Sequence, residues 1–252
     1  MFWTALRKEL LEQWRSYRLL IVLAVLLGFG LTSPLLAKLT PELLKQLPEG
    51  GEAIAQLIPE PTALDAVAQY VKNLTQFGVI LALLMTMGAV AQEKDKGTAA
   101  MMLVKPMPRG VFLAAKFTAL CLTFALGLAL AGLAGYYYTL LLFEALDAPR
   151  FLALNGLLLV FVAVHVALTL FFSTLARSPV AAGGMAFGGV ILLALVGVSP
   201  SASQYLPGQL VAWGAGLMAG NLDPSWPALW TSLAFIAAAL VGARALFEKQ
   251  EL

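Results

Sequence analysis

Charge is scarce in this sequence, and so are the residues that most often carry catalysis. Only 12% of the 252 residues are charged while 60% are hydrophobic, whereas soluble domains carry about 25% charged residues. So little charge cannot cover the surface of a water-soluble globule, which excludes an ordinary soluble domain. The single cysteine, Cys121, excludes a disulfide within the chain, and the single histidine is His165.

Motifs for nucleotide binding, metal binding and hydrolysis are missing as well. The sequence contains no Gly-x-x-x-x-Gly-Lys-Ser/Thr loop to hold ATP phosphates, no His-x-x-x-His pair and no Gly-x-Ser-x-Gly. We therefore expect a non-catalytic chain that binds no metal and no cofactor. We also expect no nucleic acid among its partners.

Long apolar runs are the dominant feature that is present. A helix needs about 20 apolar residues to cross about 30 Å of hydrocarbon, and it satisfies its backbone hydrogen bonds internally. Six runs meet this requirement: residues 19–37, 74–91, 117–143, 151–175, 180–198 and 226–246. The sequence therefore predicts an all-α membrane protein with six spans, a single transmembrane domain over 1–252 that sits in the lipid bilayer.

The distribution of basic residues predicts how these spans are oriented. An even number of spans places both termini on one side of the membrane. With the termini in the cytoplasm, four of the 16 Lys and Arg residues lie outside and the other twelve lie inside. Because cytoplasmic loops carry an excess of Lys and Arg, we expect a multi-pass protein of the inner or plasma membrane with both termini cytoplasmic.

Shorter helical patterns flank the spans. Residues 1–18 form an amphipathic helix with Leu6, Leu10 and Trp14 on one stripe, and such a helix lies in the membrane interface or docks on a partner. On the outer side, before the second span, Thr40-Pro41-Glu42 predicts a helix start and residues 52–58 a second short piece.

Two further patterns concern the starts of the second and sixth spans. Thr62 with Asp65 resembles a capping box, which predicts that the second span begins near Thr62, above the membrane. Before the sixth span, residues 209–219 carry an apolar stripe that includes Trp213, and Gly220 follows as a helix end. This piece is too short to span, so we expect an outer helix in or on the outer leaflet.

The loop over residues 92–116 combines charges with a short apolar segment at 99–104. Gly97 can end one helix and Thr98 can cap the next, and the prolines that follow end that helix. An ordinary basic loop explains the charges of this segment. It does not explain the apolar residues, which have no core of their own and must bury against the membrane or against another protein.

Together these features resemble the permease subunits of ABC-2 type transporters. The resemblance covers the whole chain in organisation, and its sharpest residues are Glu93-x-x-x-Gly97-Thr98 after the second span and a Pro-x-x-Arg that ends the apolar stretch. It implies that the loop is a coupling helix, held in a groove of a separate ATP-binding subunit. The residues that the resemblance assigns to this contact are Glu93, Gly97, Thr98, Met101, Met102, Leu103, Pro106 and Arg109.

The same resemblance implies partners and a mechanism. ATP and Mg would bind to the partner ATPase and not to this chain. Two permease copies, identical or paralogous, would enclose the substrate path of an exporter as a dimer. The outer helix at 208–219 would help to gate the exit.

Three residues are candidates for the substrate path or its gate: His165, Tyr137 and Trp213. His165 is the only ionisable group deep in a span, and it is either a neutral imidazole hydrogen-bonded to a neighbouring helix, a group of the substrate path or a metal ligand. Tyr137 belongs to an interface belt or to an exit, and Trp213 lies on the outer helix. The spacing Gly184-x-x-x-Gly188 permits close helix approach within the fold or in a dimer.

A channel or carrier that needs no ATPase is the alternative. Such carriers usually place charged residues or broken helices near the middle of the bilayer, and the predicted spans are nearly free of charge. That scarcity favours an apolar or amphipathic substrate. A membrane-embedded enzyme is a third class, and the spans offer it no carboxylate pair and no Ser–His set.

Overall fold

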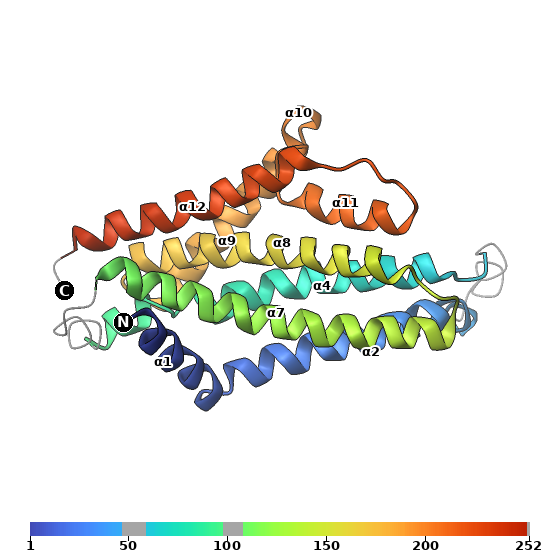
Figure 1. Ribbon diagram of the computed structural model, residues 1–252, viewed down its shortest axis with the longest axis horizontal. Helices are drawn as coiled ribbons and strands as arrows, with labels where there is room; N and C mark the ends of the chain where they lie inside the picture. The colour runs from blue at the N-terminus through green and yellow to red at the C-terminus, as the bar shows by residue number, and fades with distance from the viewer. Residues whose placement is uncertain (47–58, 98–107, 251–252) are drawn as a thin grey trace.

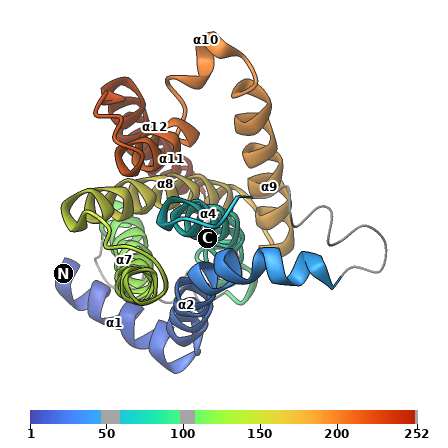
Figure 2. The same cartoon turned by 90° about the vertical axis from the view of Figure 1, so that its right-hand side faces the viewer.

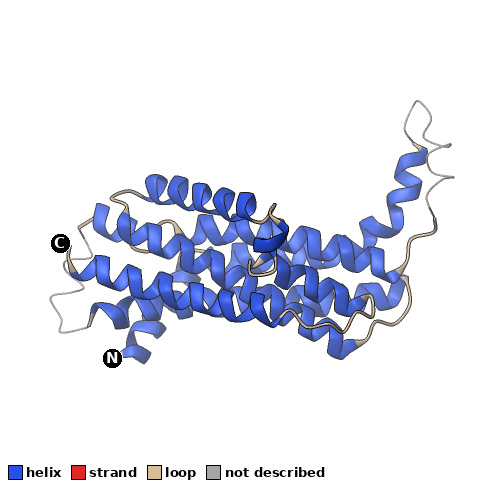
Figure 3. Cartoon of the chain, turned by 90° about the horizontal axis from the view of Figure 1, so that it is seen from above, coloured by secondary structure: helices blue, strands red, loops and turns tan. Residues whose placement is uncertain are grey.

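The computed structural model describes residues 1–46, 59–97 and 108–250, and within these it consists of helices and loops only (Figure 3). Six helical segments are long and apolar enough to cross a membrane, so the predicted all-α fold with six spans is confirmed. The long helices are α2 (Arg18–Lys45), α4 (Ala63–Thr86), α7 (Arg109–Leu142), α8 (Ala148–Leu175), α9 (Pro179–Val196) and α12 (Trp226–Glu248). The shorter ones are α1 (Phe2–Arg15), α5 (Ala91–Asp95), α10 (Pro200–Ser203) and α11 (Gly208–Met218).

Four long helices, α2, α4, α7 and α8, lie side by side and form the centre of the bundle (Figure 1). At Gly30 a Cβ would stand 2.5 Å from the carbonyl oxygen of Ala131, so α2 and α7 touch backbone to backbone, as small residues allow in membranes. Helices α9 and α12 lie at the periphery (Figure 2). We call the end at which α1 begins and α12 ends the α1 end of the bundle.

Helix α2 departs from the expected outline of the first outer loop. Thr40-Pro41-Glu42 does not start a new helix, because α2 runs through Pro34 and Pro41 and ends at Lys45. Proline removes a backbone donor and kinks a helix without always ending it. The last turns of α2 bend away from the bundle (Figure 2). The expected piece at 52–58 lies outside the described residues.

The starts of two spans follow their capping signals. Thr62 Oγ1 accepts a hydrogen bond from the Asp65 amide, while Asp65 Oδ2 accepts one from the Thr62 amide at 2.8 Å. The predicted capping box is therefore present, and the second span begins where it was expected. Ser178 caps α9 and Pro179 occupies its first turn, so α8 and α9 form a tight hairpin.

The short helix before the sixth span is α11, and it lies along α8 (Figure 1). Gly214 permits this close approach, since a Cβ there would stand 2.6 Å from Cδ1 of Leu154. Gly220 follows with a φ of +87°, a left-handed conformation that suits glycine at a helix end. The prediction of a short helix in this segment is confirmed.

Candidate functional site

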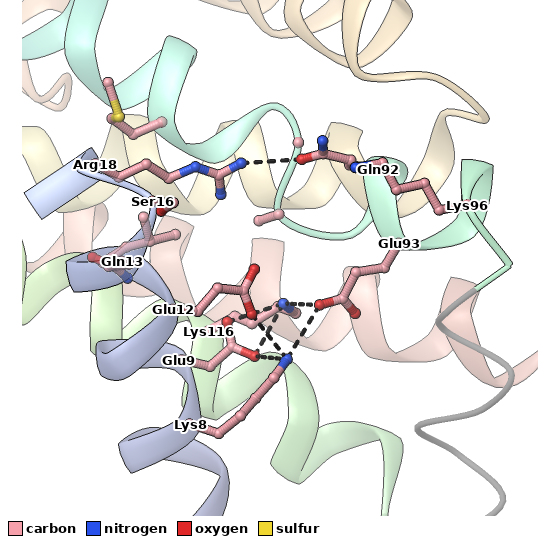
Figure 4. A pocket seen from close by; sticks show the side chains of 14 residues that line it. Lys8, Glu9, Glu12, Gln13, Ser16, Arg18, Gln92, Glu93, Lys96 and Lys116 are labelled. Carbon is pink, nitrogen blue, oxygen red and sulfur yellow. Dashed lines mark hydrogen bonds and ion pairs between the residues drawn. The ribbon is translucent and has the colours of Figure 1, made fainter.

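Five charged side chains from three helices meet at the α1 end of the bundle (Figure 4). Lys116 of α7 is at the centre, with only 3% of its side chain exposed. Its Nζ donates to both carboxylate oxygens of Glu9 in α1, at 3.1 and 3.0 Å, and to Oε1 of Glu93 in α5 at 2.8 Å. One buried ammonium group therefore holds two carboxylates from segments far apart in the sequence.

Lys8 completes what we call the charged cluster, which consists of Lys8, Glu9, Glu12, Glu93 and Lys116. Lys8 Nζ lies 3.1 Å from Glu9, 3.1 Å from Glu12 and 3.5 Å from Glu93. Burial works to lower the pKa of Lys8, but the charges of Glu9 and Glu93 raise it overall. Burial likewise works to raise the pKa of Glu12, and the hydrogen bond and charge of Lys8 hold it below its ordinary value. These shifts keep both groups ionised near neutral pH.

A break in the second span brings Glu93 to this place. Helix α4 ends at Thr86, a turn follows, and α5 starts at Ala91. Ser173 of α8 satisfies the backbone of that turn: its Oγ donates to the Met87 carbonyl at 2.8 Å and accepts from the Val90 and Ala91 amides at 3.0 and 3.1 Å. Buried backbone groups need such partners, so α8 fixes the direction in which α5 leaves the membrane span.

Helix α1 reaches the charged cluster with a face that is partly polar. Leu6, Glu9 and Gln13 are buried against the bundle, and Gln13 accepts a hydrogen bond from Thr123 of α7. Trp3 and Trp14 are exposed. Spacings of three and four residues place Leu6, Glu9 and Gln13 on one side of the helix, and the two tryptophans are not part of that buried face.

A cavity of about 430 Å³ adjoins the charged cluster, between α1, the start of α2 and α5. Arg18 Nη2 donates to Oε1 of Gln92 at 3.0 Å across its other side (Figure 4). Residues from both ends of the loop at 92–116 line this cavity, because Gln92, Glu93 and Lys116 all face it.

Comparison with known proteins identifies the family. The profile of the family described as ABC-2 family transporter protein matches residues 3–211. The chain belongs to the ABC-2 transporter family. An uncharacterized transmembrane protein, YxlG, from Bacillus subtilis (strain 168) is 29% identical over 213 residues, which cover 81% of this chain and 80% of that protein. The chain is therefore a membrane component of an ABC transporter, of a generally non-catalytic kind that works with an ATP-binding subunit.

In this ABC-2 permease the residues predicted for ATPase contact have different surroundings. Glu93 lies in the charged cluster, and Gly97 ends its helix with a φ of +66°. Arg109 starts α7, donates to the backbone carbonyls of Phe247 and Gln250 and lies 5.5 Å from the centre of the Phe247 ring. The remaining members, Thr98, Met101, Met102, Leu103 and Pro106, lie outside the described residues. Contact with an ATPase stays a prediction for all of them.

The three candidates for the substrate path of the permease lie apart from the charged cluster. His165 is buried in α8, and its Nδ1 lies 2.8 Å from the carbonyl oxygen of Phe161. Tyr137 is 60% exposed near the far end of α7. Trp213 of α11 packs edge-on against Trp226, with ring centres 5.6 Å apart. Among the described contacts, none joins any two of these three residues, so the structure does not bring them into one site.

Sequence reasoning missed four members of the charged cluster as site residues of the permease: Lys8, Glu9, Glu12 and Lys116. Their only signal was spacing: Glu9 shares a helical face with Leu6, and Lys116 immediately precedes a long apolar run. Carboxylate oxygens of Glu9, Glu12 and Glu93 lie within 4.8 Å of one another, an arrangement that can hold a cation. Lys8 and Lys116 already bind these oxygens, so we assign no metal to the charged cluster.

Proposed function

We propose that this chain is the permease subunit of an ATP-driven exporter, moved by a separate ATP-binding subunit that contacts the loop at 92–116. The α1 end of the bundle faces the cytoplasm, in agreement with the excess of Lys and Arg there. ATP and Mg bind to the partner subunit. Two permease copies, identical or paralogous, enclose the substrate path in the plasma or inner membrane.

One observation carries this proposal: the ion pair between Glu93 and Lys116 joins the two ends of the loop at 2.8 Å. A force applied to the loop therefore acts on α5 and α7 together, because this ion pair connects the two helices directly. Breaking a buried pair by removing one partner typically costs about 3–5 kcal/mol, so the joint resists separation.

Further contacts extend this joint to the rest of the bundle. Glu9 connects it to α1. Lys94 Nζ donates to the Thr174 carbonyl of α8 at 2.6 Å, and Arg109 connects the start of α7 to the end of α12. Movement of the loop thus reaches five helices, α1, α5, α7, α8 and α12, through hydrogen bonds at one end of the molecule, and such a network can carry mechanical coupling.

The periphery of the bundle supports a dimer. Helix α9 carries Gly184 and Gly188, four residues apart. A Cβ added at either glycine would have no described neighbouring atom within 4 Å. These glycines therefore serve no close packing within the described chain. Small residues on an exposed apolar helix permit close approach of a second helix in a membrane, and a second permease copy would supply it.

Copurification with a candidate ABC ATP-binding subunit tests the proposal. Deletion of residues 99–104 is expected to abolish the complex or its ATP hydrolysis, while membrane insertion is unchanged. Glu93→Lys is expected to do the same, but it also breaks the pair with Lys116. Lys116→Met breaks the same pair but leaves the Glu93 side chain available to a partner subunit, and so separates the two effects.

Two results test how the loop is coupled to the bundle. If Lys116→Met keeps the complex with the ATPase but loses ATP hydrolysis, the ion pair transmits the movement, whereas unchanged hydrolysis would show that the pair is not needed for coupling. Unchanged ATP-driven activity in the 99–104 deletion would remove the loop from the coupling mechanism.

A further inference from the structure

A second cavity of about 430 Å³ lies between α4, α8, α9 and the segment from α10 to α11. Its walls are mostly apolar and include Val79 of α4, Phe161 of α8, Leu193 of α9 and Leu206 before α11. His165 supplies the imidazole on this wall, and it is 4% exposed. An apolar cavity with a few placed polar groups is the usual form of a small-molecule site.

The hydrogen bond of His165 determines what its ring can offer to a molecule in this cavity. The Nδ1 atom lies 2.8 Å from the backbone carbonyl oxygen of Phe161. A carbonyl oxygen only accepts, so Nδ1 carries the hydrogen. In a neutral imidazole the other nitrogen, Nε2, then has a lone pair and accepts.

The bond is made within α8 itself, four residues back along the chain. His165 is therefore not the brace between neighbouring helices that its sequence position could have indicated. Within the part of the chain that the structure describes, Nε2 has no hydrogen-bond partner. The polar atoms that are both fully enclosed and without a partner do not include Nε2. The atom is thus not fully enclosed, and a hydrogen-bond donor in the adjoining cavity would satisfy its lone pair.

We propose that Nε2 of His165 accepts a hydrogen bond from an apolar or amphipathic ligand with a hydroxyl or N–H group, bound in this cavity. The apolar walls select the body of the ligand, and the lone pair selects a donor over an acceptor. A second polar group, the amide of Gln209, lies on the same wall at the start of α11. The identification of this ligand as the transported molecule rests on the proposed function, whereas its binding does not.

The single histidine of the chain gives a direct test. The full chain is labelled with ¹⁵N-histidine and placed in phosphatidylcholine nanodiscs without any ATPase, so that one imidazole is observed by NMR. The spectrum is expected to show hydrogen on Nδ1 and a lone pair on Nε2. Two probes of matched apolar length are then added, 1-decanol, which donates, and decyl methyl ether, which cannot.

The expected result is a saturable shift of the Nε2 resonance with 1-decanol and none with the ether. Ala194→Phe is the control variant, because Ala194 lines the cavity and a larger side chain fills it while His165 stays in place. This variant should keep the Nδ1–H form and lose the shift.

Three results would overturn the proposal: hydrogen on Nε2, equal or absent responses to both probes, or a shift that persists in Ala194→Phe. None of them depends on ATP hydrolysis. Failure of the permease proposal would instead appear as the absence of an ATPase from the purified complex, so the two failures are distinguishable.

Discussion

At the scale of single residues, Lys116 shows how burial changes the meaning of a charge. In the sequence it counts as one basic residue of a cytoplasmic loop. In the structure it is nearly enclosed and holds Glu9 and Glu93. Desolvating an ammonium group is expensive unless good partners repay it, so these three residues act as a unit and the loss of one leaves the others unmatched.

Replacement of Lys116 by Met tests this unit. The apolar side chain fills the space but leaves two carboxylates without their shared partner, and we expect a loss of about 3 kcal/mol in the free energy of unfolding. Thermal unfolding in detergent measures it. Lys249→Met, an exposed change at the same end, is the control and should be nearly neutral. Equal effects of the two substitutions would contradict the buried ion pairs.

Glu12 predicts an acid sensitivity of the docking of α1. Its pKa is lowered from the ordinary 4.5, because the hydrogen bond and charge of Lys8, with further charge from Lys116 and Arg18, outweigh the opposing effect of burial. A lowered folded pKa contributes stability that is complete above about pH 4.5 and is lost as the pH falls through the lowered value.

The measurement is thermal unfolding between pH 3 and pH 7. Glu12→Gln is expected to reduce stability near neutral pH and to flatten the acid limb of the curve. Glu248→Gln provides the matched control, since Glu248 is also paired, with Arg244, but is exposed. An acid limb of Glu12→Gln as steep as that of the unchanged protein would remove Glu12 from this role.

At the scale of elements, hydropathy and capping signals predicted the structural features that depend on one segment of the chain alone. The six spans follow from apolar length, and the start of α4 follows from Thr62 and Asp65. The continuation of α2 through Pro41 did not follow, because proline signals both a helix end and a kink. The charged cluster could not be predicted either, since it depends on a turn after α4 that Ser173 of another helix stabilises.

Glycines also cannot be interpreted from the sequence alone. Only the packing of the helices shows which glycines are needed for close approach within the chain and which are not. The same substitution at two positions makes a matched test. Gly30→Leu is expected to prevent folding, since even a Cβ would stand 2.5 Å from the Ala131 carbonyl oxygen. Gly184→Leu meets no described atom within 4 Å and is expected to leave the unfolding temperature of the single chain unchanged.

The association of permease copies gives the second readout for this pair. Gly184→Leu should weaken crosslinking between copies in the membrane, because a large side chain blocks close approach of α9 to a partner helix. A folded Gly184→Leu variant that crosslinks as well as the unchanged chain would exclude this face of α9 from the dimer.

At the scale of the whole molecule, orientation decides whether the charged cluster can meet an ATPase at all. Helix α1 and the end of α12 lie at the α1 end, while the far end of α7 lies at the other (Figure 1). Glu144 follows that end of α7 by two residues. Lys249 and Glu144 are both exposed, so each can carry a reporter cysteine after Cys121, the only native thiol, is replaced by Ala.

A membrane-impermeant maleimide applied to intact cells is expected to label Glu144→Cys and to spare Lys249→Cys. Opening the membrane should make Lys249→Cys reactive, which also shows that the cysteine itself is accessible. The physical reason is the excess of Lys and Arg at the α1 end, which retains it in the cytoplasm. ATP is available only on that side, so the reverse labelling pattern would place the loop at 92–116 where no ATP-driven subunit could reach it.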